Sequence, residues 1–290
     1  MSFIAYLIIL SISFFFNLFP RRLSLFFGKL LGLFIYYVLP VRKKIAIQNI
    51  TENLPELNNQ EHKDILKNIY IHFGMVLTDF LRTKKLNKKN INKIVHIDYK
   101  TKQLLNENQG AIIMTGHLGN WEYFLPTFGL NDFKFSIVAQ RIKNSYLDSF
   151  FSNIRTMKNV EVIFKSDGTK KMLSVIKNKI FLGLASDQNA GKKGTQVELL
   201  NIKASIPKGA AIFHIKTGAP IIIGYCIMNK QKNYEFRAEM LNTKDIDFEK
   251  DDAIYRINRK FTTSLEEMIK KYPNQYFWFH KMKNKKQYKK

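Results

Sequence analysis

The stretch Thr115-Gly116-His117-Leu118-Gly119-Asn120-Trp121-Glu122 decides the fold predicted for this chain of 290 residues. The apolar run from Ala111 to Met114 before it has the composition of a buried strand, and Trp121 to Phe128 after it predicts a helix. A strand-to-helix turn in an open α/β sheet lies at the carboxyl edge of its strand, where ligand-binding crevices form. Glycines flank the histidine, so the backbone can bend sharply and a substrate can approach closely. We therefore expect a ligand site on this turn.

The spacing of His117 and Glu122 suits acid–base chemistry. One residue lies on the turn and the other at the start of the predicted helix, so the carboxylate can fold back onto the imidazole, fix its tautomer and stabilise the imidazolium. The other ring nitrogen is then available to accept a proton. The chain has no G-x-S-x-G elbow that would supply a serine nucleophile. We therefore expect a substrate hydroxyl to be the nucleophile, with His117 removing its proton as it attacks an acyl carbonyl.

These residues resemble a known family. Gly116 to Glu122 resembles the H-x4-D/E signature of glycerolipid-type acyltransferases, and in particular the G-H-x-G-N-W-E form of the lipid A biosynthesis acyltransferases, which transfer lauroyl or myristoyl chains. Four further segments resemble that family in the same order along the chain: Gln140-Arg141 with Asn144 and Arg155, Ser186-Asp187-Gln188 with Gly191 and Gly194, Lys208 to Pro220, and Tyr272 to His280. The ordered set covers nearly the whole chain and is far more specific than H-x4-E alone.

The resemblance implies a reaction and a set of site residues. It implies a membrane-bound O-acyltransferase that moves a fatty acyl chain from an acyl-carrier-protein thioester to a hydroxyl of a phosphorylated lipid A precursor, in the late acylation steps of lipopolysaccharide biosynthesis. His117 would be the general base and Glu122 the acid that orients it, with no metal, nucleotide or other cofactor. The predicted substrate-binding residues are Arg141, Asn144, Arg155, Asp187 and Gln188.

Alternatives remain for several of these residues. Arg141 could bind a phosphate or stabilise developing negative charge, or form only a surface salt bridge. Asp187 could hold a substrate hydroxyl or order the glycine-rich loop after it. A metal site is not indicated, because H-x4-E lacks the H-E-x-x-H spacing and no second His or Cys stands at ligand spacing. His280 is the other histidine that we exclude least firmly. Leu199 to Asn201 departs from an F-F-G run common in the family, which leaves the acyl length and the acceptor open.

The charge balance predicts an anionic partner. The chain has 47 Lys and Arg against 23 Asp and Glu, a formal net charge of +24. An acidic carrier protein, an anionic glycolipid and an acidic membrane surface all qualify, whereas no zinc finger, RNP box or basic zipper indicates nucleic acid. The single cysteine, Cys226, excludes an intramolecular disulfide and falls in an apolar strand pattern, where a buried thiol is expected.

The N-terminal region indicates a membrane. Phe3 to Phe19 is almost uninterruptedly apolar and is about 25 Å long as a helix, so we expect a membrane anchor, with a buried core helix as the alternative. Leu23 to Leu39 is interrupted by Lys29 and is expected to lie at the interface or to pack on the domain. We therefore divide the chain into a membrane-associated region, residues 1–40, and an acyltransferase domain, residues 41–290. Because thioester donors are made in the cytoplasm, the catalytic domain is expected on the cytoplasmic face of an inner membrane.

The remainder of the chain predicts an α/β fold. Residues 61–82 have apolar side chains at helical spacing. After residue 134, strands and helices alternate, which is typical of a mostly parallel central sheet flanked by helices, and the family resemblance implies the glycerol-3-phosphate-acyltransferase type of that fold. The predicted strands are 135–138, 160–164, 180–184 and 220–228, and the predicted helices are 146–157, 170–177 and 210–216.

Two other functions fit the residues. One is the same chemistry on another lipid acceptor, such as a lysophospholipid, an amino-acid lipid or a glycosylated phosphoinositide. The other is a non-catalytic basic protein that binds a membrane surface. The second would be insensitive to substitution of His117 and sensitive to reversal of the lysine charges.

Overall fold

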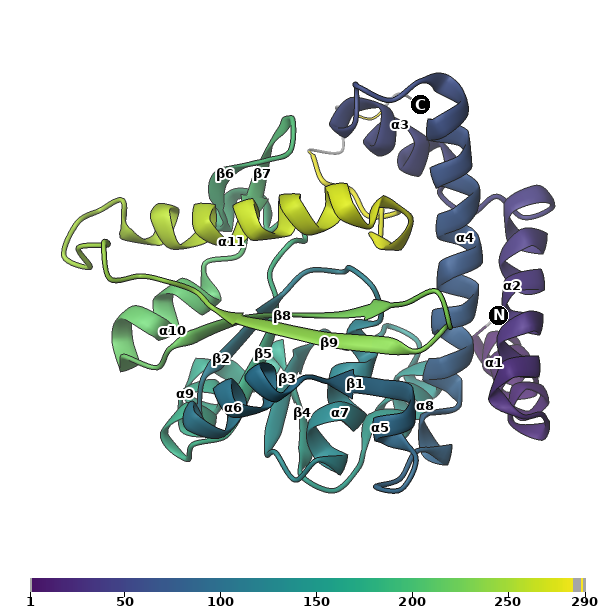
Figure 1. Cartoon of the computed structure of the whole chain (residues 1–290), viewed down its shortest axis with the longest axis horizontal. Coiled ribbons are helices and arrows are strands. Elements are labelled where there is room, and N and C mark those ends of the chain that lie inside the picture. The colour runs from purple at the N-terminus through teal and green to yellow at the C-terminus, as the bar shows by residue number, and fades with distance from the viewer. Residues whose placement is uncertain (1, 284–287, 289–290) are drawn as a thin grey trace.

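A seven-stranded sheet forms the centre of the molecule (Figure 1). The computed structural model describes residues 2–283 and residue 288. The strand order is β1-β9-β8-β2-β5-β3-β4, and neighbouring strands are parallel except for the antiparallel pair β8 and β9. The strands are β1 (Val95–Ile97), β2 (Ile112–Thr115), β3 (Phe135–Ala139), β4 (Val160–Phe164), β5 (Phe181–Ala185), β8 (Ile221–Met228) and β9 (Tyr234–Met240). The predicted α/β class with a mostly parallel sheet is confirmed.

Helices cover both faces of this sheet, which explains why its central strands are continuously apolar. Ile112, Ile113 and Met114 of β2 are all 0 % exposed. Ile112 and Met114 pack in a core with α9, α10 and α11, whereas Ile113 packs with α5, α6 and α7 on the opposite face. These helices are α5 (Ile91–Ile94), α6 (Tyr99–Glu107), α7 (Phe124–Leu130), α9 (Gly168–Lys177), α10 (Gly209–Thr217) and α11 (Ala253–Lys271). A hairpin of β6 (Thr195–Leu199) and β7 (Ile202–Ile206) packs against α11.

The long helix α4 (Asn59–Leu81) stands beside the tip of the β8–β9 hairpin (Figure 1). It begins at a capping box in which Asn58 accepts from the backbone of Glu61 and the Glu61 side chain accepts from the backbone of Asn58. Its bounds agree with the helix predicted over residues 61–82. The remaining α-helices are α1 (Ser2–Leu18), α2 (Arg21–Tyr37), α3 (Lys43–Asn53) and α8 (Ser145–Arg155).

Helix α2 lies directly against α4 because small residues face one another. A Cβ built on Gly32 would lie 2.2 Å from the carbonyl oxygen of Tyr70, and one on Gly74 would lie 2.2 Å from that of Gly28. Such distances exclude any side chain at these positions without movement of the helices. The expectation that the second apolar run packs on the domain is met by this contact.

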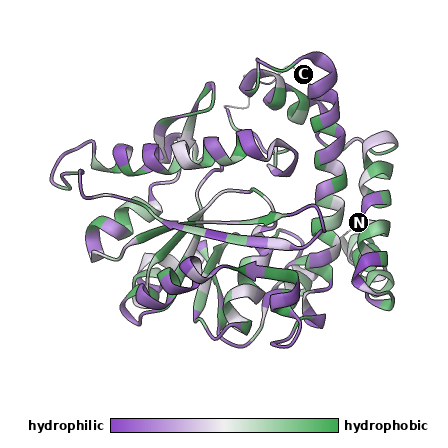
Figure 2. Ribbon diagram, in the orientation of Figure 1, coloured by the Kyte–Doolittle hydropathy of each residue, from purple (hydrophilic) through white to green (hydrophobic). Residues whose placement is uncertain are grey.

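The structure does not support the predicted transmembrane anchor. Across residues 2–283, no helix is both long and apolar enough to cross a membrane. Helix α1 has 17 residues, and its Phe16, only 3 % exposed, packs in a small core with Phe80, Leu81 and Ile154. Figure 2 shows hydrophobic residues gathered in the central strands and in the helices at the N-terminus. The apolar character of α1 is thus used in part for packing, while the division of the chain at residue 40 stays a prediction.

Candidate active site

The turn after β2 is held by backbone hydrogen bonds on two sides. The amide of Gly119 donates to the carbonyl of Gln275 at 2.9 Å, the amide of Asn120 donates to the carbonyl of Cys226 at 2.8 Å, and the amide of Phe277 donates to the carbonyl of His117 at 2.9 Å. Gly119 has φ of 68°, a left-handed conformation that favours glycine. The turn is therefore fixed between strand β8 and the segment that follows the 3-10 helix η5 (Pro273–Gln275).

The carboxylate that contacts His117 belongs to Asp187. His117 Nδ1 lies 2.6 Å from Asp187 Oδ1, and the His117 backbone amide donates to Asp187 Oδ2 at 2.7 Å. Strands β2 and β5 are parallel neighbours with Thr115 opposite Ala185, so the residues two positions further along each chain emerge side by side. The Asp187 side chain is completely buried, and both of its oxygens are directed at one residue.

The electrostatics of the pair determine the protonation state of both side chains. Burial by itself would raise the pKa of Asp187, but the charge of His117 and the hydrogen bonds from it lower this pKa to about 2. For His117, burial by itself would lower the pKa, but the charge and hydrogen bond of Asp187 outweigh it and raise the pKa above its usual value. An ionised Asp187 therefore fixes the proton of the neutral imidazole on Nδ1 and leaves a lone pair on Nε2.

The second ring nitrogen of His117 faces Gln188, which is exposed to solvent. The side-chain amide of Gln188, an exposed residue, donates to Nε2 at 3.2 Å, and 14 % of the His117 side chain is exposed. Trp121 lies edge-on to the imidazole with ring centroids 4.7 Å apart, and the rings of Phe277 and His280 are each 6.2 Å from it. Burial lowers the pKa of His280 to about 4, so this histidine is neutral near pH 7.

Glu122 has a different partner from the one that the sequence predicted. Its carboxylate accepts two hydrogen bonds from Arg155, one from Nε at 2.9 Å and one from Nη2 at 2.5 Å. Arg155 is the last residue of α8, and burial, which would lower its pKa, is outweighed by Glu122, which raises it. The expected hydrogen bond from the His117 ring to the Glu122 carboxylate is thus absent, and Glu122 forms an ion pair with Arg155 instead, because the Nδ1 of His117 already contacts Asp187. Glu122 still contributes by its charge, which raises the His117 pKa.

Two other predicted residues form a separate group after β3. Arg141 donates to Asp148 at 3.1 Å, lies 3.8 Å above the ring of Phe164, and has a side chain that is 59 % exposed. Asn144 is the N-cap of α8, where its side chain accepts from the backbone amides of Tyr146 and Leu147. The structure therefore brings together His117, Asp187 and Gln188, places the Glu122–Arg155 pair beside them, and gives Arg141 and Asn144 contacts of their own. Their roles in binding substrate stay predictions.

A buried polar network supports the turn, and the sequence analysis did not identify it. Asn120 donates to the hydroxyl of Tyr234 at 3.1 Å, and this hydroxyl donates to Asp79 of α4 at 2.8 Å. Asp79 also accepts from Arg21 at 2.8 and 2.7 Å, and its side chain is completely buried. The sequence does contain a signal of this network: Asp79 falls on the apolar face of the predicted helix. A charge buried on such a face requires a partner.

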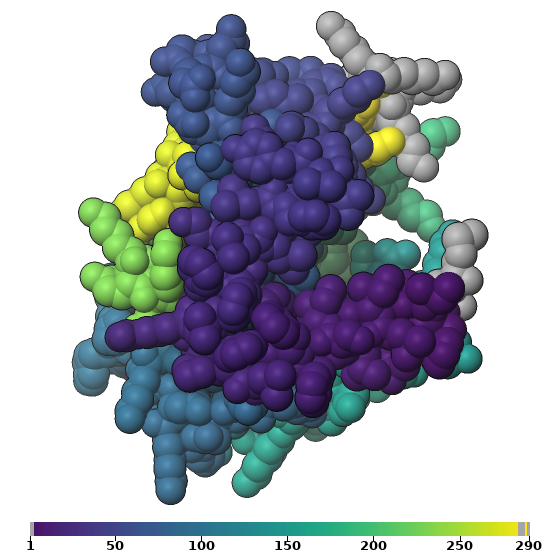
Figure 3. All heavy atoms as spheres, turned by 90° about the vertical axis from the view of Figure 1, so that its right-hand side faces the viewer, coloured from purple at the N-terminus to yellow at the C-terminus, as the bar shows by residue number. Residues whose placement is uncertain are grey.

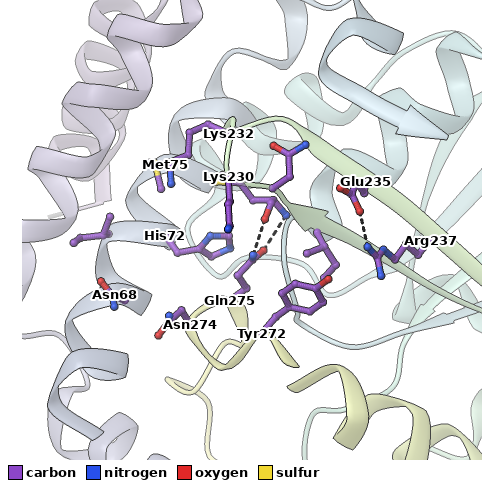
Figure 4. A pocket seen from close by; sticks show the side chains of 14 residues that line it. Asn68, His72, Met75, Lys230, Lys232, Glu235, Arg237, Tyr272, Asn274 and Gln275 are labelled. Carbon is purple, nitrogen blue, oxygen red and sulfur yellow. Dashed lines mark hydrogen bonds and ion pairs between the residues drawn. The ribbon is translucent and has the colours of Figure 1, made fainter. Parts of the chain in front are cut away.

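His72 and Gln275, which both line a cavity of about 580 Å³, give the turn a second support (Figure 4). His72 Nε2 lies 3.4 Å from the carbonyl oxygen of Gly119, and burial lowers the pKa of His72 to about 4. The side chain of Gln275 accepts from the Met228 amide at 2.9 Å and donates to the Met228 carbonyl at 2.8 Å. His72 therefore contacts the backbone of the turn itself, and Gln275 fixes the backbone of β8 beside it. In the described part of the chain, no three His, Cys, Asp or Glu side chains gather as a metal site would require.

Known proteins resemble this chain over part or nearly all of its length. A phosphatidylinositol mannoside acyltransferase of Mycolicibacterium smegmatis is 25 % identical over 126 residues, which are 42 % of this chain and 41 % of that protein. Phosphatidylinositol mannoside acyltransferases of two Mycobacterium tuberculosis strains are 25 % identical over 121 residues, 40 % of this chain and 38 % of theirs. The match thus spans about two fifths of the length of these relatives. The model of the bacterial lipid A biosynthesis acyltransferase family matches residues 2–285, nearly the whole length, and the chain belongs to that family.

Proposed function

We propose that this protein is a lipid O-acyltransferase that moves a fatty acyl chain from an acyl-carrier-protein thioester to a hydroxyl of a phosphorylated lipid A precursor. The observation that carries the proposal is the His117–Asp187 pair on the turn after β2. His117 Nδ1 lies 2.6 Å from Asp187 Oδ1, and Nε2 faces the exposed side chain of Gln188. Family membership supports acyl transfer as the reaction class.

In the proposed mechanism, His117 acts as general base and then as general acid. The acceptor hydroxyl displaces the Gln188 amide from Nε2 and gives its proton to that nitrogen while its oxygen attacks the thioester carbonyl. The imidazolium that forms is stabilised by the ionised Asp187. When the tetrahedral intermediate collapses, the carbon–sulfur bond breaks and the leaving thiolate takes the proton from Nε2. The products are an ester and a free thiol, and His117 is neutral again.

The remaining polar groups suit the two substrates. The displaced Gln188 amide is a donor beside the reacting carbonyl, where it can stabilise the oxyanion. The Glu122–Arg155 pair holds the end of α8 against the start of the helical segment after the turn, and the Glu122 carboxylate raises the pKa of His117. Arg141, which is exposed, is assigned to an anionic group of the acceptor or of the carrier protein. A net charge of +24 favours both of these acidic partners.

We assign the protein to the cytoplasmic face of an inner membrane, resting on the surface. Helix α1 exposes a row of apolar side chains, among them Phe3, Ile4, Phe14 and Leu18, each at least half exposed. Figure 3 shows α1 on the outside of the molecule, with the face hollowed between α1 and the block of α2 and α3. An exposed apolar helix beside a hollow face is suited to receiving a lipid substrate from a bilayer.

A second acceptor is favoured by the relatives. The mycobacterial proteins are named phosphatidylinositol mannoside acyltransferases, so a glycosylated phosphoinositide is the alternative acceptor for the same chemistry. Both acceptors are anionic glycolipids with free hydroxyls, and the His117–Asp187 pair would act identically on each.

The test is an assay of the purified full chain with acyl-carrier-protein and coenzyme A donors against a panel of acceptors. The panel contains a lipid A precursor, a phosphatidylinositol mannoside and a lysophospholipid, and mass spectrometry detects the gain of one acyl unit. We expect transfer to the lipid A precursor that is lost in His117→Ala. Transfer only to another acceptor would replace the substrate assignment, and an unchanged His117→Ala enzyme would refute the mechanism.

A further inference from the structure

A pocket of about 1010 Å³ between the end of α2, the start of α3 and α4 gathers positive charge. No Asp or Glu is among the residues that line it within the described part of the chain. The cations that line it come from three places in the sequence: Arg42, Lys43 and Lys44 at the start of α3, Lys63 on α4, and Lys281 near the C-terminus. Segments far apart in the sequence therefore direct like charges at one space, which opposes folding unless an anion is present.

Among the described residues, these five cations have no acidic partner. The Lys43 ammonium lies 3.9 Å above the ring of Tyr36, and Arg42 donates to the backbone carbonyl of Phe279 at 3.2 Å. Lys44 and Lys63 are exposed. None of the five forms a salt bridge within residues 2–283 and 288, although twelve such pairs exist elsewhere there. Lysine ammonium groups without carboxylate partners are available to a phosphate.

Exposed apolar side chains border this pocket. Tyr37 at the end of α2 is 66 % exposed, and Val38, Leu39 and Val41 between α2 and α3 are 58 %, 55 % and 62 % exposed. They continue the exposed apolar stripe of α2, formed by Leu23, Phe26, Leu30 and Phe34. Exposed apolar residues beside unpaired cations are typical of a protein surface that binds at a bilayer interface. The apolar residues contact the acyl chains and the cations contact the headgroups.

We propose that this pocket binds the phosphate headgroup of an anionic lipid while the lipid remains in the bilayer. The site is separate from the proposed acyl transfer and uses none of its residues. The segment Phe279–His280 lies between this pocket and His117. Arg42 of the pocket contacts the carbonyl of Phe279, and the ring of the next residue, His280, is 6.2 Å from the ring of His117. A bound lipid would thus hold the protein on the membrane next to the wall of the active site.

The experiment measures binding of the full chain to vesicles by flotation. The vesicles are phosphatidylcholine with a minor fraction of phosphatidic acid, or with a fatty acid that supplies equal negative charge through carboxylates. Wild-type protein is expected to prefer the phosphate-bearing vesicles. The double variant Lys44→Ser/Lys63→Ser is expected to bind them on the order of 25-fold more weakly, since each lysine near an acidic surface contributes about a fivefold factor.

The matched control is Lys102→Ser/Lys177→Ser, which removes two exposed lysines from α6 and α9, at the far end of the molecule in Figure 1. The control should lose less than about twofold, and all variants should keep the wild-type unfolding temperature. Equal losses in the two double variants, no loss in the pocket variant, or equal binding to carboxylate vesicles would each overturn the proposal. Acyl transfer in detergent micelles should be unchanged in the pocket variant, so failure of the headgroup site is distinguishable from failure of the proposed reaction.

Discussion

Asp187 directs both carboxylate oxygens at His117, one at the ring nitrogen and one at the backbone amide. The two residues lie 70 positions apart and meet because β2 and β5 are parallel neighbours in register. A carboxylate that contacts both the ring nitrogen and the backbone amide of one histidine fixes the orientation of the ring as well as its tautomer. The relationship assigns to Asp187 the orienting role that spacing alone gave to Glu122.

Replacing this carboxylate by an amide tests that assignment. Asp187→Asn retains the shape of the side chain but cannot stabilise the imidazolium, and the equivalent change in a Ser-His-Asp triad costs on the order of 10⁴ in rate. We expect kcat to fall by about 10³ to 10⁴ with little change in KM. Steady-state assays measure the fall, and Asp132→Asn, which removes a surface carboxylate that is 59 % exposed, is the control. A loss of less than tenfold would show that Asp187 does not serve the base.

The pH profile should report the pKa of His117. Catalysis requires neutral Nε2, so kcat/KM is expected to fall as pH decreases through the His117 pKa, which Asp187 holds above the ordinary value of 6.5. The charge of Lys165 lowers this pKa, so Lys165→Gln should move the acidic limb to higher pH, and added salt should reduce that shift. The measurement is kcat/KM against pH for both proteins. A midpoint below 6.5 in the wild type, or a shift to lower pH in the variant, would contradict this account.

Glu122 and Arg155 should prove coupled in stability. Their side chains are 13 % and 20 % exposed, so removing either partner leaves a largely buried charge without its counter-charge. We expect Glu122→Ala to lower the free energy of unfolding by about 2–3 kcal/mol, and the double variant with Arg155→Ala to lose less than the sum of the single losses. Denaturant unfolding of the four proteins gives the coupling energy.

The same four proteins separate a positioning role of Glu122 from a catalytic one. If the ion pair serves mainly to hold α8 to the turn, Arg155→Ala should reduce acyl transfer about as much as Glu122→Ala does. If Arg155→Ala keeps full activity while Glu122→Ala loses it, Glu122 has a direct role at His117.

The fold was largely predictable because its signals are local. Buried runs such as Ile112–Thr115 and the strand containing Cys226 carry their own composition, and the helix containing Asp79 has a clear period. The partner of His117 was not predictable from spacing, because it depends on which strands become neighbours. The sequence does show that Asp187 follows its predicted strand by the same number of residues as His117 follows its own. It does not show that these two strands, β2 and β5, are neighbours in the sheet. The apolar length of α1 predicted a helix that spans the membrane. The sequence alone could not show that Phe16 of this helix packs against α4 and α8.

The close approach at Gly119 gives a test of how tightly the turn must be held. A Cβ at this position would lie 2.1 Å from the carbonyl oxygen of Cys226, in addition to the strain of φ at 68°. Gly218 has φ of 69° with open space around its Cβ position, so Gly218→Ala isolates the strain. We expect Gly218→Ala to cost about 1–2 kcal/mol of stability and to keep kcat. Gly119→Ala is expected to cost about 2–5 kcal/mol, because overpacking adds to the strain, and to reduce kcat at least tenfold by moving His117. Unfolding curves and kcat of both variants are the measurements, and equal effects would show that the contact between the turn and β8 is dispensable.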